Sequence, residues 1–420
     1  MDVVQADVDP AAGRTAVVID MSDSEFAKID EAYRSQGAAA AVDELVRGLE
    51  ANHDWHRLFD ALLFKKKLEM GLPVARPASF DLVPENRQSE FEESYLEAAR
   101  RVGRAFLAEN NIPQAWMYLR TVREPQAVAE ALEHLDAKDS LPENVDDLIS
   151  VALYERAHPV KGLELMLKSR GTCNTITAFD QAITQISSDE RLRGAELLVK
   201  HLYGELVESV SRDLERRGAE PGGASLKPAT LLEAITGRDW LFDEGNYHVD
   251  VSHLGAVVRF ARFLNPESPQ LEKAIELCEY GRRLSEQFQY PADPPFDDYY
   301  KAHLHFFRVL AGSDRQKSLD YFRDRLSVAT ETDDRRLIAY VLVDLLVRVG
   351  ALEDAALLAA EHLRDLDESS GFSFAQLCEE AGRLDLFREA AREKGDLIGF
   401  TSALVGQATM SGTPSVTRQT

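Results

Sequence analysis

The sequence is poor in cysteine, and no pattern organises the few cysteines that it has. Only three of its 420 residues are cysteine, namely Cys173, Cys278 and Cys378, and they lie far apart with no CxxC pair. An odd number of widely separated cysteines argues against a disulfide framework. Because free thiols persist in reducing compartments, we expect a cytoplasmic protein.

Long apolar runs are also missing. No stretch approaches the roughly 20 apolar residues that a helix needs to span a bilayer. Residues 1–14 contain acidic residues and no apolar core, so we expect no secretory signal there. Together these absences argue against a membrane-spanning or secreted chain.

The motifs of the commonest phosphate-binding and hydrolytic sites do not occur. The sequence contains no GxxxxGK[ST], no HExxH, no GxSxG and no credible GxGxxG. Phosphate-cradling and serine-hydrolase mechanisms therefore lose their best support. We lean away from an enzyme on this ground.

Basic residues are in short supply relative to acidic ones. The chain has 48 lysines and arginines against 72 aspartates and glutamates, which gives a formal net charge of −24. A field of that sign repels phosphate backbones and anionic lipids, so nucleic acids and membrane surfaces are not expected partners. A neutral or basic protein segment is favoured, although the charge has the simpler alternative role of keeping the chain soluble.

Alternation with a period of two residues is nearly absent, with weak exceptions at 16–19 and 247–251. Apolar residues instead recur at three- and four-residue steps between short breaks of Gly, Pro, Asn or Asp, which is typical of helices. Three helices are expected before residue 71. Further helices are predicted at about 88–109, 113–121, 125–135, 143–157, 159–168, 172–186, 189–216, 228–236, 251–264, 269–288, 296–311, 315–328, 333–349, 352–365, 373–381, 384–393 and 396–405. The fold class predicted is all-α, with irregular antiparallel helix hairpins.

The glycine-rich stretch at 218–227 is the clearest linker in the chain. It predicts two helical-repeat halves, at 21–217 and 228–406. Residues 1–20 are expected to be loosely attached, and residues 407–420 to form a mobile tail.

One predicted helix hairpin, at 97–124, has small residues at the positions where two antiparallel helices must approach closely. Gly103 lies three residues before Phe106, and Ala115 follows nine residues later, with Asn110 and Asn111 at the turn. Glycine and alanine let two helix backbones approach, while a large residue fills the neighbouring groove.

A second hairpin, at 342–363, repeats the arrangement with Leu342, Leu346, Gly350 at the turn and Ala355 at the contact. In these two hairpins the chain resembles a degenerate tetratricopeptide-like α-solenoid, while hairpins at 151–166 and 374–391 match poorly. The resemblance implies that a concave face binds a peptide or protein segment. It carries over no specific binding residue.

The densest polar cluster is His248, Asp250 and His253, ahead of and within the first turn of a predicted helix. Imidazole and carboxylate groups are suitable ligands for a transition metal, which is the only cofactor that we consider. The alternative is that Asp250 caps the helix and the histidines pack locally. His303 and His305 are two residues apart on one helix, so both cannot face one site.

Several residues are candidates for contact with a partner. The run Lys65, Lys66 and Lys67 is a basic patch for an acidic partner or simply a solvated face. Trp116, Tyr118 and Arg120 belong to the residue types that anchor interfaces, although Trp116 can instead pack between repeats. Asn174 follows Cys173 at an expected helix start, where exposed amides can lower a thiol pKa. Buried free cysteine is the simpler interpretation.

The function that we expect from the sequence is a protein- or peptide-binding scaffold that uses the concave face of a helical solenoid. One alternative is a metal-dependent helical enzyme centred on His248, Asp250 and His253. Another is an obligate oligomer that uses the long helix at 189–216 as its seam.

Overall fold

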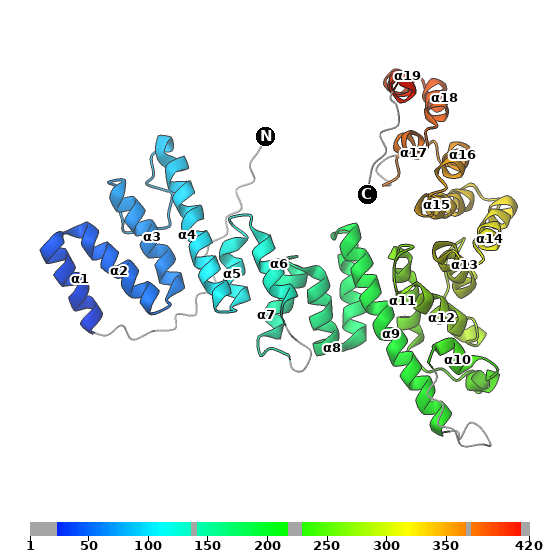
Figure 1. The fold of residues 1–420 in the computed structure, drawn as a ribbon, viewed down its shortest axis with the longest axis horizontal. Helices are drawn as coiled ribbons and strands as arrows, with labels where there is room; N and C mark the ends of the chain where they lie inside the picture. Colours follow the sequence, from blue (N-terminus) through cyan, green and yellow to red (C-terminus); the bar gives the residue numbers. More distant parts are fainter. Residues whose placement is uncertain (1–22, 136–140, 217–228, 367–370, 413–420) are drawn as a thin grey trace. The chain divides into compact units, whose positions relative to one another are not determined.

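The computed structural model describes residues 23–135, 141–216, 229–366 and 371–412, and the regular structure in these ranges is entirely helical (Figure 1). The all-α prediction is confirmed. No strand occurs in these ranges, so the weak strand signal at 247–251 is wrong, and Asp250 caps the helix that begins at Val251. The weak exception at 16–19 lies outside the described residues.

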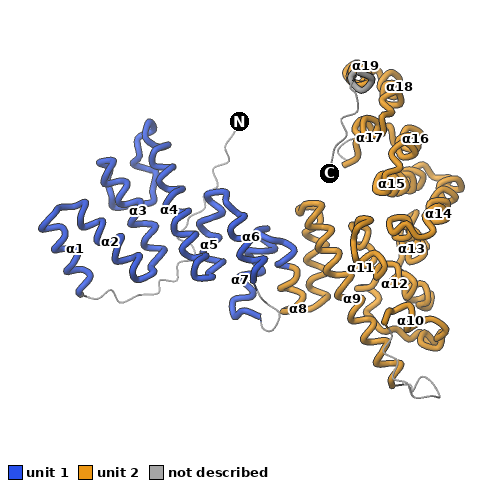
Figure 2. The backbone as a smooth tube through the Cα atoms, viewed as in Figure 1, with its two compact units in different colours: residues 1–162 blue, residues 163–420 orange. Residues whose placement is uncertain are grey.

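The chain divides into two compact units, Met1–Gly162 and Leu163–Thr420 (Figure 2). The predicted linker at 218–227 and the predicted loose segment at 1–20 both lie outside the described residues. The predicted division into halves at 218–227 therefore stays a prediction. The tail expected from residue 407 begins inside a helix that runs to Gly412.

In the first unit, each of the helices α1 to α5 packs on the next one along the chain, and α7 packs on α5. Residues 70–87 form a long connection that ends in a 3₁₀ turn, Glu85–Arg87. The helices of this unit are α1 (Asp23–Gln36), α2 (Ala38–Ala51), α3 (Trp55–Glu69), α4 (Gln88–Ala108), α5 (Ile112–Leu119), α6 (Pro125–Glu133) and α7 (Val145–Ile149), which a π-helical turn extends over Ser150–Tyr154.

In the second unit, α13 packs on α11, α12, α14 and α15, and its side chains are nearly all buried. The helices of this unit are α8 (Pro159–Ala182, which starts before the boundary), α9 (Ser188–Arg216), α10 (Leu231–Ile235), α11 (Val251–Phe260), α12 (Leu271–Gly281), α13 (Tyr299–Ala311), α14 (Arg315–Val328), α15 (Thr332–Arg348), α16 (Leu352–His362), α17 (Phe374–Glu380), α18 (Leu384–Lys394) and α19 (Leu397–Gly412). Short 3₁₀ segments lie at Asp239–Gly245, Ala261–Phe263 and Glu286–Phe288.

The long helix α9 buries its apolar stripe inside the second unit. Leu198, Leu202, Leu206 and Val210 have no exposed surface, and α9 packs on α10, α11 and α12. This stripe forms part of the core, since neighbouring helices of the same unit cover it. It therefore does not offer a seam to a second copy of the chain.

One predicted break is confirmed and one predicted helix is too long. The break expected between the helices at 159–168 and 172–186 is present, because Gly171 adopts the non-helical φ 80° at a kink inside α8. The helix expected at 269–288 ends at Gly281, because the Gln289 side chain turns back and donates hydrogen bonds to the carbonyls of Gly281 and Leu284. These bonds satisfy carbonyl groups that a helix end leaves without partners.

Candidate partner-binding site

The α4–α5 hairpin has the close contact that its sequence predicts. Gly103 lies directly against Leu119 and Tyr118, and Ala115 is fully buried. Asn110 adopts φ 58° at the turn between the two helices. In the hairpin α15–α16, Gly350 likewise adopts φ 76° at the turn, and Ala355 is fully buried.

The predicted interface residues on α5 point largely into the first unit. Trp116 is buried, and its Nε1 donates a 2.6 Å hydrogen bond to Glu155. Tyr118 is buried too, and its hydroxyl lies 2.7 Å from Nδ1 of His56. Arg120 is partly exposed and donates to the same Glu155 carboxylate at 2.7 Å. Trp116 and Tyr118 therefore hold the unit together, as the packing alternative expected for Trp116.

The lysine run is not an open basic patch. Lys65 pairs with Asp43 at 2.7 Å, and this hydrogen bond raises the pKa of Lys65. Lys66 pairs with Glu90 at 2.9 Å, and its hydrogen bond lowers the pKa of that carboxyl. Lys67 is buried, which corrects the expectation of a solvated face. A run of three charges does not reveal in sequence which member turns inward.

The Lys67 ammonium holds the long connection of the first unit, residues 70–87, against α3. Its Nζ donates hydrogen bonds of 2.6 Å to the carbonyls of Arg76 and Ser79, and it lies 5.2 Å from the Phe91 ring centroid. The connection turns its carbonyls inward here, where a buried charge supplies the donors that they need.

His248 and Asp250 have different partners. His248 lies between two neighbours, with Nε2 3.2 Å from Asp213 and Nδ1 3.1 Å from the Tyr280 hydroxyl. Asp250 caps α11 by accepting from the amides of Ser252 and His253, and the Ser252 hydroxyl lowers the pKa of this carboxyl. The capping alternative thus describes what Asp250 does.

Within the described ranges, no three histidine, cysteine or acidic side chains are grouped so that they could hold a metal ion. His303 and His305 also face different neighbours, the carbonyl of Tyr299 and the hydroxyl of Ser318. The metal site, and the enzyme that depends on it, stay predictions to which the geometry adds no support.

Cys173 is exposed just after the kink in α8. Its neighbour Asn174 donates to the Arg170 carbonyl at 2.8 Å, so this amide stabilises the kink locally. The preceding Thr172 hydroxyl lies 3.0 Å from His201 and 3.3 Å from Glu205 on α9. Thr172 is far from His201 and Glu205 in the sequence, so the local residue pattern could not predict these contacts.

In a usual amphipathic helix the large apolar side chains face the core. Helix α19 has the reverse arrangement. Its two buried residues are the small Gly399 and Ala403, and Phe400 and Gly406 are half-buried. A Cβ atom on Gly399 would lie 3.1 Å from Phe387, and one on Gly406 would lie 2.7 Å from Leu384. The backbone of α19 therefore lies close to α18 at these glycines, and most of the larger α19 side chains point elsewhere.

Several large apolar residues of α19 are left in solvent. Leu397 is 80% exposed, Ile398 is 84% exposed and Val405 is 59% exposed. The whole helix, Leu397–Gly412, contains no charged residue in a chain that is 29% charged. This uncharged run was the available sequence signal, but helical periodicity alone did not show that its large residues would face outward.

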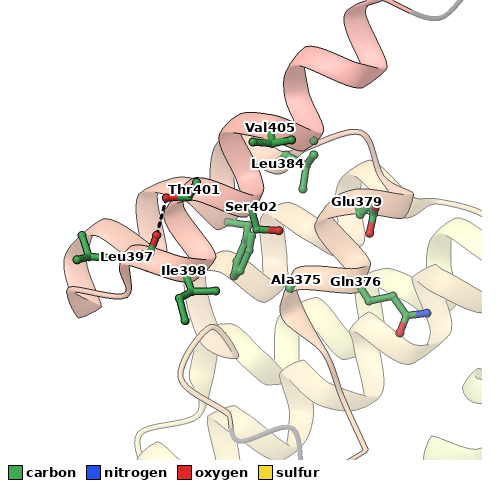
Figure 3. A pocket seen from close by; sticks show the side chains of 11 residues that line it. Ala375, Gln376, Glu379, Leu384, Leu397, Ile398, Thr401, Ser402 and Val405 are labelled. Carbon is green, nitrogen blue, oxygen red and sulfur yellow. Dashed lines mark hydrogen bonds between the residues drawn. The ribbon is translucent and has the colours of Figure 1, made fainter.

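These residues border a hollow of about 780 Å³ between α17, α18 and α19 (Figure 3). We call this hollow the C-terminal groove. Its apolar wall consists of Ala375, Leu384, Phe387, Leu397, Ile398 and Val405. Its polar lining consists of Gln376, Glu379, Thr401 and Ser402, of which Glu379 alone is charged.

The lining of the C-terminal groove is suited to binding and not to chemistry. Thr401 donates its hydroxyl proton to the Leu397 carbonyl within the helix at 2.7 Å. The nearby thiol of Cys378 is buried, and burial raises its pKa to about 12, so it stays protonated at neutral pH. With no nucleophile–base pair among the lining residues, the groove offers apolar contact area and one carboxylate.

No family model matches this sequence, and no curated protein and no solved structure matches it significantly. None of the helices in the described ranges combines the length and the apolar character that crossing a membrane requires. The site is therefore interpreted from its own geometry.

Proposed function

We propose that this protein is a scaffold that binds a segment of another polypeptide in the C-terminal groove. The observation that carries the proposal is the reversed arrangement of α19, which turns small residues inward and leaves Leu397, Ile398 and Val405 exposed beside a hollow. Exposed apolar patches rimmed by polar residues mark interaction sites on soluble proteins. Covering each of these side chains would contribute on the order of 1–2 kcal/mol.

The lining indicates the chemistry of the partner. A helix with an apolar face fits a groove with an apolar wall, as in other helix-in-groove complexes. Glu379 favours a basic residue at the edge of that helix, and the net charge of −24 favours a neutral or basic partner overall. The proposed ligand is thus an amphipathic helix with a neutral or basic polar side.

The same proposal extends to the architecture and the location. We propose that the hairpins continue as a tetratricopeptide-like solenoid. The pairwise packing of consecutive helices, the close contact at Gly103 and the buried Ala355 of the second hairpin support this. We also propose a cytoplasmic location, which the three unpaired cysteines support.

Site-specific photo-crosslinking in cells tests the proposal. A photoreactive amino acid replaces Thr401 in the C-terminal groove, and a matched control carries it at Val328, which is exposed at the end of α14. We expect a discrete crosslinked polypeptide from position 401 only, and its loss when Ile398→Asp is added. Identical products from both positions, or none from position 401, would contradict the proposal.

A further inference from the structure

A half-buried arginine in the second unit lacks the partner that such a charge usually has. Arg262 lies in the 3₁₀ turn Ala261–Phe263 that follows α11. Its guanidinium makes no hydrogen bond and no ion pair with any described residue, and its Cζ lies 4.8 Å from the centroid of the Phe296 ring. Contact with a ring face leaves the N–H donors of a guanidinium free. The side-chain nitrogens still reach solvent, so a ligand can approach them.

The two arginines beside Arg262 are each paired with a carboxylate. Arg259, one turn earlier on α11, lies 3.0 Å from Asp180. Arg348 reaches over from α15, and its Nε lies 3.0 Å from Asp344. Asp344 also acts on the charge of Arg262, but Arg348 already holds its oxygens. The positive charge of Arg262 is therefore the one in this group that has no counter-charge of its own.

The turn that carries Arg262 is held in place by its neighbours. Nη1 of Arg348 donates hydrogen bonds to the carbonyls of Arg262, at 2.6 Å, and of Leu264, at 3.3 Å. The Arg348 Cζ lies 5.7 Å from the centroid of the Phe306 ring, and the rings of Phe306 and Phe296 are 6.2 Å apart. Both phenylalanines are buried, so the two arginine–phenylalanine contacts rest on the core. A site that is fixed in this way loses little freedom when a ligand binds.

The chemistry of the missing partner follows from the guanidinium. Burial lowers the pKa of Arg262, which shows that its surroundings disfavour the unpaired charge. A carboxylate or phosphate group offers two oxygens that match the planar N–H fork of arginine, and such bidentate pairs are strong and specific. The net charge of −24 does not prevent this binding, because salt screens charges more than about 8 Å away, so the local balance dominates.

We propose that Arg262 binds an oxoanion, supplied by a carboxylate or a phosphate group, through its free N–H donors. Arg259 and Arg348 flank the site and add to its positive potential while they stay paired. The site is formed by the turn after α11, by Phe296 ahead of α13 and by α15, whereas the C-terminal groove lies between α17, α18 and α19. The inference therefore goes beyond the proposed function and does not depend on it.

Thermal unfolding of the full chain tests this proposal with two anions, inorganic phosphate and acetate, each compared with chloride at the same ionic strength. We expect at least one of them to raise the Tm by about 2 °C or more at a concentration well above its Kd. A response to phosphate alone identifies a phosphate site, and a response to acetate alone identifies a carboxylate site. Because phosphate also stabilises proteins by exclusion from their surface, the measured quantity is the difference between the wild type and Arg262→Met.

Three variants separate binding from a structural role. Arg262→Met should keep its Tm in chloride, since it removes an unpaired charge, and should lose the response to the anion. Arg262→Lys keeps the charge without the planar fork and should weaken binding about tenfold. Arg336→Met is the matched control on the exposed surface of α15, and its response should equal that of the wild type.

A measurement on the unchanged chain covers the case in which Arg262→Met does not fold. An arginine-selective dicarbonyl reagent is applied in chloride, phosphate and acetate, and peptide mass spectrometry follows each site. We expect the binding anion to slow the labelling of Arg262 and to leave that of Arg336 unchanged.

Three outcomes would overturn the inference. The first is an anion response that is equal in the wild type and in Arg262→Met. The second is labelling of Arg262 that neither anion slows. The third is an Arg262 side chain that the reagent does not modify even in chloride, because its donors would then be closed to any ligand.

Discussion

A Cβ atom on Gly103 would lie 2.6 Å from Cγ of Leu119 and 3.3 Å from Cβ of Tyr118. Leu119 has no exposed surface, so it cannot move aside into solvent. The interface between α4 and α5 is therefore set by the absence of one methyl group. Overpacking at such a position usually costs 1–3 kcal/mol.

Gly103→Ala should lower the free energy of unfolding by about 1–3 kcal/mol, because the added methyl group has no space. Urea denaturation followed by circular dichroism measures the change. Gly48→Ala is the matched control, because Gly48 is also helical and has no atom within 4 Å of its Cβ position. There we expect a gain of about 0.5–1 kcal/mol, and equal effects at both glycines would contradict the packing argument.

Lys67→Met should destabilise the first unit by about 2–3 kcal/mol, because it leaves the carbonyls of Arg76 and Ser79 without their donor. Methionine keeps the side-chain length and removes the charge. Lys65→Met, two residues away and paired with Asp43 on the surface, should change stability by less than about 1 kcal/mol. Thermal unfolding of both variants measures how much more stability is lost at the buried donor Lys67 than at the exposed Lys65.

The buried imidazoles of α13 predict a loss of stability in acid. Burial lowers the pKa of His303 from about 6.5 to about 3, and that of His305 to about 4. Between pH 6.5 and 3 the unfolded chain therefore binds more protons than the folded chain, and stability falls as pH falls.

His303→Phe should make this fall shallower, by up to about 1.4 kcal/mol per pH unit. Urea unfolding of the wild type and the variant from pH 8 to pH 4 measures the two slopes. At pH 8 the imidazole is neutral in both states, so the difference there reports packing alone. Parallel curves at all pH values would show that His303 protonates without cost in the folded state.

The three thiols should react very differently with a thiol-directed reagent at neutral pH. Cys173 is exposed, whereas Cys278 and Cys378 are buried, and burial raises the pKa of both buried thiols. We expect one equivalent of label in the folded protein, at Cys173, and three after denaturation. Mass spectrometry of the labelled peptides identifies the sites, and rapid native labelling of Cys278 would show that unit 2 opens readily.

Helix positions followed from the sequence where the contacts are local. Gly103 and Ala115 lie on consecutive helices, so their spacing alone predicted the close approach of α4 and α5. The α14 boundaries, Arg315–Val328, also match the periodicity. Predictions failed where a distant or folded-back side chain decides, as when Gln289 ends α12 or Asp213 lies beside His248.

The sequence by itself determined that this chain is helical, acidic and poor in cysteine, because periodicity and composition are local properties. Only the tertiary structure decided which side of α19 is covered. In α19 both sides are uncharged, so no pattern distinguishes inside from outside. Phe387 and Leu384 on α18 determine which side faces inward, because they contact Gly399 and Gly406 and leave room only for small residues there. Leu397 and Ile398 therefore stay in solvent.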